Sequence, residues 1–165
     1  MLHEVTIAGL TIDQTSNTPI LILKSITDEH TIPIWIGLLE ATSIASVMQN
    51  INFDRPMTHD LFKNLLEKEN MEVAKIEVCD LKDNTFYAKI YFLSPEKNFS
   101  MDARPSDAIA MALRFKAPIY VDDKVIDTFK NADNDFELSD KSTEGKKWAD
   151  YLEKLSPEDF GKYKV

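Results

Sequence analysis

Segments with strand-like and helix-like patterns follow one another in blocks along this chain instead of alternating. The expected strands cover residues 3–13, 19–25, 31–37, 71–81, 85–93, 99–103 and 119–121. The expected helices cover residues 38–51, 58–70 and 106–116. Block order of this kind is typical of α+β proteins, whereas doubly wound sheets need regular alternation. We therefore predict an α+β fold with a mixed, mostly antiparallel sheet and three packed helices, plus a C-terminal helix.

Two segments carry more specific expectations about their place in the fold. Pro33 lies within the third strand pattern, and a proline cannot donate to a strand ladder, so this strand is expected to lie at a sheet edge or to end early. The helix pattern at 106–116 is apolar on nearly all sides, which predicts a buried helix.

The length of 165 residues suits one domain of ordinary size with a tail. We expect a domain over residues 1–130 and a linker with a helical tail over 131–165. Within that tail, residues 131–141 are polar and predict a linker. Residues 142–155 predict a short terminal helix, with Trp148 and Leu152 among its apolar residues.

Charge and composition limit the classes of function and the compartment. The formal net charge is −9, and nucleic-acid binders usually depend on basic patches, so tight nonspecific binding of nucleic acid is disfavoured. Cys79 is the only cysteine, which leaves no internal disulfide. No apolar run approaches the roughly 20 residues that span a bilayer. We therefore expect a cytoplasmic protein without a membrane partner.

Two related motifs stand where helices are expected to begin, "RPMTHDL" at 55–61 and "RPSDAIAMALR" at 104–114. Thr58 and Ser106 are residue types that favour the N-cap, where a hydroxyl accepts from a free backbone N–H. Asp60 and Asp107 fall in the first turn, where the helix dipole favours a negative charge. Helix capping therefore explains both motifs without any catalytic role.

The same motifs also fit a site that binds and cleaves a phosphate ester. Arginine beside a helix N-terminus binds phosphate well, so the candidate phosphate-binding residues are Arg55, Thr58, Arg104 and Ser106. Histidine and carboxylates can transfer protons, so the candidate catalytic residues are His59, Asp60, Asp107 and Glu40. Asp60 and Asp107 are also candidates for holding Mg²⁺ or Mn²⁺, although the sequence alone leaves the cofactor open.

An aromatic run on the fifth expected strand offers a further alternative for nucleic-acid contact. Phe86, Tyr87, Tyr91 and Phe92 are able to stack on bases, as in sheet-based RNA binders. Basic residues are sparse in this run, so cross-strand packing is the preferred interpretation.

Five motifs in this order resemble the bifunctional nuclease domain family, and together they cover about residues 3–127. They are "IPIWIGLLEA" (32–41), "RPMTHDL" (55–61), "LKDNTFYAKI" (81–90), "DARPSDAIAMALR" (102–114) and "APIYV" (117–121). The resemblance implies an α+β fold, a homo-oligomer and nuclease activity on RNA and DNA. The motif positions of the family correspond here to the candidate residues already named, which are Glu40, Arg55, Thr58, His59, Asp60, Arg104, Ser106 and Asp107.

Two hypotheses about function remain open on the sequence. The first is a nuclease that hydrolyses phosphodiester bonds of RNA and DNA. The second is a non-catalytic oligomeric module that binds an anionic ligand or a protein partner. The arrangement of the two helix starts separates them: a shared open site favours the nuclease, and arginines locked in buried salt bridges favour a structural role.

Overall fold

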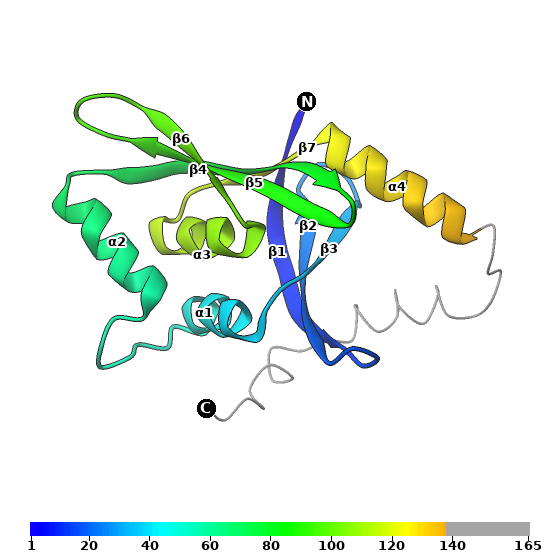
Figure 1. The fold of residues 1–165 in the computed structure, drawn as a ribbon, viewed down its shortest axis with the longest axis horizontal. Coiled ribbons are helices and arrows are strands. Elements are labelled where there is room, and N and C mark those ends of the chain that lie inside the picture. The colour runs from blue at the N-terminus through cyan, green and yellow to red at the C-terminus, as the bar shows by residue number, and fades with distance from the viewer. Residues whose placement is uncertain (138–165) are drawn as a thin grey trace.

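Seven strands form one sheet in the computed structural model, which describes residues 1–137 and the side chains of residues 1–131. The strands are β1 (Leu2–Asp13), β2 (Thr18–Ser25), β3 (Thr31–Trp35), β4 (Glu72–Lys82), β5 (Thr85–Leu93), β6 (Phe99–Ala103) and β7 (Ile119–Asp122). The helices are α1 (Leu38–Met48), α2 (Thr58–Lys68), α3 (Pro105–Phe115) and α4 (Asp123–Glu137). This arrangement confirms the predicted α+β class (Figure 1).

The sheet consists of two antiparallel meanders joined by one inserted strand. Its order is β3-β2-β1-β7-β4-β5-β6, and every neighbouring pair is antiparallel except β4 with β7. The sheet is therefore mixed and mostly antiparallel, as predicted. β3, which contains Pro33, lies at one edge, and this confirms the position expected from its missing N–H donor.

The turn between β4 and β5 shows how local sequence sets the register of the sheet. Asp83 and Asn84 both have positive φ angles, 49° and 59°, which are the angles of a tight two-residue hairpin turn. Asp and Asn tolerate this left-handed region better than other non-glycine residues. The turn sets Lys82 opposite Thr85, and a bulge between Val78 and Asp80 then shifts the register, so that Val78 lies opposite Ala88 and Ile76 opposite Ile90.

α1, α2 and α3 pack in layers beneath one half of the sheet (Figure 1). α3 lies directly against β4 and β5, and α1 and α2 both pack on α3. The residues of α3 from Ala108 to Ala112 are all at most 1% exposed, so the predicted burial of this helix is confirmed. The burial of α3 fixes where its first turn lies relative to α1 and α2.

α4 was not expected from the sequence, and it corrects the predicted linker. The helix begins at Asp123, directly after β7, and continues to Glu137, so residues 131–137 are helical instead of a linker. Val125 and Ile126 are buried, and α4 packs on β4 and β7. This apolar contact stabilises a helix whose later residues are mostly polar. The helix predicted at 142–155 lies outside the described residues.

No helix within residues 1–137 is long and apolar enough to cross a membrane.

Candidate active site

Three helices bring the candidate site together from segments that are far apart in the sequence. α1 contributes Glu40 and Ser43, and α2 contributes His59. Arg104 and Asp107 stand at the start of α3. We call these five residues the helix-start cluster. Hydrogen bonds and ion pairs connect all five.

The caps of α2 and α3 differ from the sequence prediction. The N-caps are Met57 and Arg104, and neither side chain makes a capping hydrogen bond. Thr58 is therefore the first residue of α2, and Ser106 is the second residue of α3 after Pro105. The prediction was wrong for Ser106 because proline, whose fixed φ suits the first helical position, begins the helix one residue earlier.

Arg104 connects the carboxylates of α1 and α3. Its Nε atom donates to Asp107 Oδ2 at 2.7 Å, and its Nη2 atom donates to Asp107 Oδ1 at 3.1 Å. Its Nη1 atom lies 2.8 Å from Glu40 Oε1. The Arg104 side chain is 65% exposed, whereas Glu40 is 18% exposed. The guanidinium therefore covers the carboxylates and faces solvent.

His59 lies between Asp107 and Ser43, with both ring nitrogens engaged. Its Nε2 atom is 2.9 Å from Asp107 Oδ1, and its Nδ1 atom is 2.7 Å from Ser43 Oγ. An ionised carboxylate only accepts hydrogen bonds, so Nε2 carries the proton. In the neutral ring, Nδ1 is then an acceptor, and it takes the hydrogen bond that the Ser43 hydroxyl donates.

Burial and hydrogen bonding act in opposite directions on Asp107. Partial burial raises the pKa of the Asp107 carboxyl, but the hydrogen bonds from Arg104 and His59 outweigh it and hold the pKa below its ordinary value. The pKa of Arg104 is raised, chiefly by its hydrogen bond to Asp107. Both groups therefore stay charged near neutral pH.

A second ion pair, between Arg114 and Asp60, contacts the cluster at Ser43, and Arg114 was not among the predicted residues. Arg114, near the end of α3, is 4% exposed, and its Nε atom donates to Asp60 Oδ1 at 2.8 Å. Its Nη2 atom donates to Ser43 Oγ at 3.1 Å. The other Asp60 oxygen accepts from the Met57 backbone N–H at 3.1 Å. Asp60 thus ties the start of α2 to α3.

Sequence reasoning missed Ser43 and Arg114, although one signal was present. Arg114 is the one charged residue between Ala108 and Phe115, and a charged residue in a buried helix needs a partner. Its partners lie 54 and 71 residues away, at Asp60 and Ser43, so spacing along the chain does not reveal them.

The remaining predicted phosphate-binding residues do not join the cluster. Arg55 is exposed and makes no ion pair or side-chain hydrogen bond within the described part of the chain. Thr58 is exposed, and Ser106 is 5% exposed and so buried. Of these four residues, only Arg104 lies beside His59 and Asp107.

The two candidate metal ligands are already committed to other partners. Both oxygens of Asp107 contact Arg104, and both oxygens of Asp60 accept N–H donors. Among residues 1–137, no group of three or more His, Cys, Asp or Glu residues is placed to hold a metal ion. Mg²⁺ needs carboxylate oxygens that are free to coordinate it, so these residues do not fit a metal site in this arrangement.

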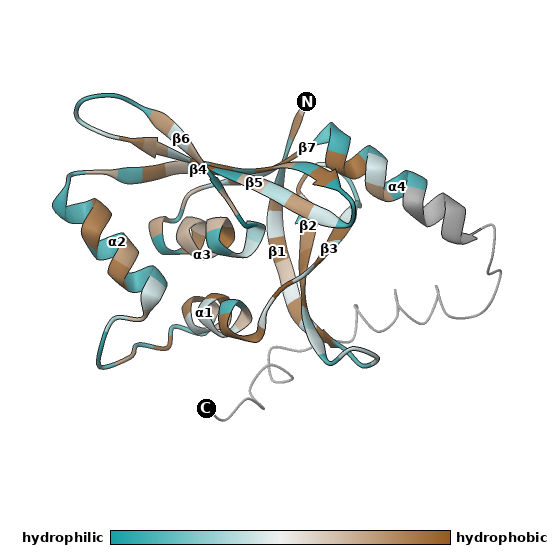
Figure 2. Ribbon diagram, in the orientation of Figure 1, coloured by the Kyte–Doolittle hydropathy of each residue, from teal (hydrophilic) through white to brown (hydrophobic). Residues whose placement is uncertain are grey.

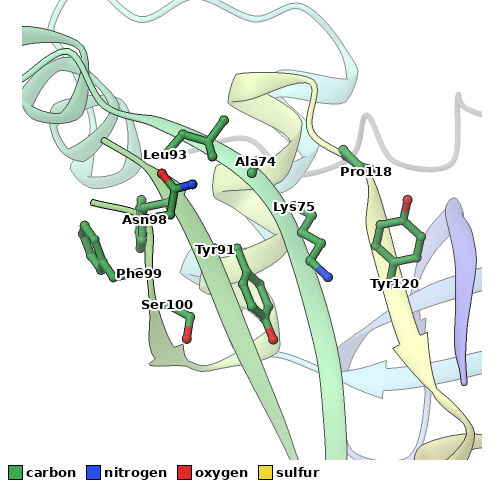
Figure 3. A pocket seen from close by; sticks show the side chains of 10 residues that line it. Ala74, Lys75, Tyr91, Leu93, Asn98, Phe99, Ser100, Pro118 and Tyr120 are labelled. Carbon is green, nitrogen blue, oxygen red and sulfur yellow. The ribbon is translucent and has the colours of Figure 1, made fainter. Parts of the chain in front are cut away.

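Two hollows lie near the helices and on the sheet. One, of about 390 Å³, is lined by Ser46, Phe53 and Asp60 among others, between α1 and the start of α2. The other, of about 530 Å³, lies over β4 and β5, where Lys75, Tyr91 and Tyr120 surround it (Figure 3).

The groove over the sheet carries little free charge for a nucleic acid. Lys75 pairs with Glu77, and its Nζ atom lies 4.5 Å from the centre of the Tyr91 ring. The Tyr91 hydroxyl donates to Glu77 at 2.7 Å, which is the main reason that its pKa is raised to about 12. Phe92 is buried and stacks on Phe99 of the neighbouring strand, in agreement with the preferred packing interpretation.

Comparison with known proteins identifies the family. The family model described as "Bifunctional nuclease domain" matches residues 21–133. A Mycobacterium tuberculosis protein named "Uncharacterized protein Rv1829" is 34% identical over 164 residues, covering 96% of this chain and 98% of the relative. "Bifunctional nuclease 1" of Arabidopsis thaliana is 32% identical over 94 residues, covering 54% of this chain and 29% of the relative. "Bifunctional nuclease 1" of Oryza sativa subsp. japonica is 26% identical over 97 residues, covering 57% of this chain and 29% of the relative.

The matched region contains all five residues of the helix-start cluster, and the family agrees with the resemblance that the ordered motifs indicate. The chain therefore belongs to the bifunctional nuclease domain family.

Proposed function

We propose that this protein hydrolyses phosphodiester bonds in RNA and DNA at the helix-start cluster. The observation that carries the proposal is the hydrogen-bonded line from Arg104 through Asp107 to His59, assembled from two helices and partly open to solvent. Family membership and the names of the plant relatives support a nuclease-related function.

Each residue of the cluster has a role that follows from its contacts. Asp107 holds the proton of His59 on Nε2, so Nδ1 is free to accept a proton from the group that attacks phosphorus. Arg104 uses three N–H groups on carboxylates, and a guanidinium has five, so two remain to bind a phosphate oxygen. Glu40 orients Arg104 toward that phosphate.

Electrostatics predict weak binding of the substrate. Glu40 and Asp107 each carry −1 and Arg104 carries +1, so these three groups sum to −1. Arg104, and Arg55, which is exposed and stands four residues before His59, are the cations proposed to attract a polyanion here. Because few phosphates are neutralised, the affinity is expected to be low and to fall only slightly as salt rises.

The test is a nuclease assay on labelled RNA and on labelled single-stranded DNA with highly purified protein. His59→Ala and Asp107→Asn should each lower the rate by about 100-fold or more, since general acid–base catalysis contributes that much. His30→Ala, which changes a partly exposed histidine between β2 and β3 that is not part of the cluster, is the matched control and should cleave like the natural protein.

Each preparation is assayed with EDTA and with added Mg²⁺ or Mn²⁺. We expect cleavage to persist in EDTA, because the Asp60 and Asp107 oxygens are occupied by N–H donors. Cleavage that is equal in the His59→Ala, Asp107→Asn and natural proteins would assign the activity to a contaminant or to another site.

A second candidate function, a non-catalytic oligomeric module, is favoured by a separate observation. α1, α2 and the segment between them expose large apolar side chains, namely Leu38, Leu39, Met48, Ile51, Phe53, Met57, Leu61 and Leu65. Figure 2 shows hydrophobic and hydrophilic residues in turn along α2. Apolar exposure on this scale is typical of surfaces that contact another protein. A second copy of this chain is the partner proposed in this case, and the two functions are compatible.

A further inference from the structure

We propose that the Ser43 hydroxyl is the nucleophile of this site and becomes covalently phosphorylated during the reaction. The inference rests on the proposed function and names the attacking group that it left open. Ser43 Oγ lies 2.7 Å from His59 Nδ1, and His59 Nε2 lies 2.9 Å from Asp107. A serine, a base and a carboxylate that orients the base are the parts that nucleophilic catalysis by serine needs.

The nitrogens of His59 are exchanged relative to the usual serine hydrolase arrangement, in which the serine contacts Nε2. The exchange keeps the chemistry, because either ring nitrogen is a base once the other is protonated. Asp107 fixes the proton on Nε2, and Arg104 in turn fixes Asp107 through two hydrogen bonds. The lone pair of Nδ1 is thereby held toward Ser43.

α1 itself provides the comparison that separates Ser43 from an ordinary helical hydroxyl. Thr42 donates to the Leu38 carbonyl at 2.8 Å, and Ser46 donates to the Ser43 carbonyl at 2.8 Å. Donation to a carbonyl three or four residues earlier is the usual arrangement for hydroxyls within a helix. Ser43 departs from it and contacts an imidazole nitrogen.

Arg114 supplies positive charge at the same oxygen. Its Nη2 atom is 3.1 Å from Ser43 Oγ, and its guanidinium is held by Asp60 and by the Ala110 carbonyl. A buried, fixed cation beside the hydroxyl stabilises the negative charge that develops on Oγ as its proton leaves. Ser43 is itself half-buried, so this stabilisation acts with limited screening by water.

The reaction balances without any added reactant except water. Ser43 Oγ forms a bond to phosphorus, its proton passes to His59 Nδ1, and the bond from phosphorus to one sugar oxygen breaks. His59 returns the proton to that leaving oxygen, while the other sugar oxygen stays bound to phosphorus, so Ser43 carries one nucleic-acid fragment as a phosphodiester. Water then attacks this phosphorus and gives one proton to His59, the Oγ–phosphorus bond breaks, Ser43 Oγ regains the proton, and the fragment leaves with a terminal phosphate.

The test is covalent labelling with a biotinylated alkyl fluorophosphonate, which reacts with activated serines and releases fluoride. The natural protein is incubated with this probe, digested, and mapped by mass spectrometry. We expect the label on the peptide that contains Ser43. Ser43→Ala should lose the label, and His59→Ala and Asp107→Asn should slow labelling by about tenfold or more. Ser46→Ala, from the same helix, is the matched control and should label like the natural protein.

Nuclease assays of the same proteins keep the two proposals apart. Labelling at Ser43 without nuclease activity would uphold the activated serine and reject phosphodiester hydrolysis. Absence of label on Ser43 in the natural protein would overturn the proposal, and so would a Ser43→Ala variant that cleaves RNA at the natural rate. Nuclease activity would then depend on water as the nucleophile. Because the first readout uses the natural protein, the result does not depend on any variant folding.

Discussion

Two arginines of α3 differ in burial, and therefore in how much each is expected to contribute to stability. Arg114 is 4% exposed and pairs with Asp60, whereas Arg104 is 65% exposed and pairs with Asp107 and Glu40. Breaking a buried ion pair leaves an uncompensated charge, while exposed pairs contribute little to stability. Arg104 therefore tests function with little loss of stability, whereas a change at Arg114 is expected to lower stability as well.

Arg114→Ala should lower the free energy of unfolding by roughly 2–4 kcal/mol, because the half-buried Asp60 and Ser43 lose their partner. Arg104→Ala should change it by less than about 1 kcal/mol and should still reduce phosphodiester cleavage. Urea unfolding followed by circular dichroism measures both. Equal losses of stability in the two variants would contradict the expected difference between the buried pair of Arg114 and the exposed pairs of Arg104.

Acid should destabilise the protein through the carboxylates of the site. The pKa values of Asp60 and Asp107 are held below their ordinary value of 3.8, as hydrogen bonds from Arg114 and Arg104 outweigh the effect of burial. A depressed carboxyl pKa contributes stability that is present above pH 3.8 and is lost as the pH falls through the folded-state pKa. Thermal unfolding between pH 5 and pH 2 should therefore show a falling midpoint. Asp107→Asn should reduce that fall, and an unchanged pH dependence would contradict the assignment.

At the scale of elements, hydrophobic periodicity predicted most of the fold. Strand patterns predicted all seven strands, and the apolar pattern of residues 106–116 predicted the burial of α3. Each of these signals lies within one segment of the sequence. α4 was missed because it follows β7 without a loop and its later residues are polar. Ser43 and Arg114 were missed because their roles depend on how distant helices meet, whereas the cap of α3 was wrong for a local reason, Pro105 at the first helical position.

The contact of α4 with the sheet is testable at its buried residue. Val125 is fully buried, so Val125→Ala should lower the free energy of unfolding by about 1–3 kcal/mol through lost apolar contact and a residual cavity. Asp127→Ala, on an exposed position of the same helix, is the matched control. Chemical unfolding measures both, and a loss in the control as large as that of Val125→Ala would mean that the burial of Val125 is not what stabilises this contact.

At the scale of the whole molecule, the apolar surface of α1 and α2 is the feature that predicts association. Leu61 and Leu65 are 61% and 55% exposed and lie one turn apart on α2. A charge placed between two apolar surfaces is costly when they meet. If a second copy covers this surface, Leu61→Glu with Leu65→Glu should shift the protein to monomer in sedimentation velocity, without loss of helix content.

The matched control for association changes two residues on the same helix that are already polar. Lys63→Glu with Lys68→Glu adds negative charge to α2 without placing it on Leu61 or Leu65. This control should keep the association state of the natural protein. A natural protein that sediments as a monomer at high concentration would reject the oligomer.

The position of β7 in the sheet has a consequence for synthesis. β7 comes from residues 119–122, yet it lies between β1 and β4 and is the strand through which the two meanders are joined. On the ribosome, the N-terminal meander and the segment carrying α1 and α2 emerge long before this strand. Contacts between segments far apart in sequence form late in folding. The sheet closes only after residue 122 has left the exit tunnel, so the complete sheet against which α3 packs forms after most of the described chain has been synthesised.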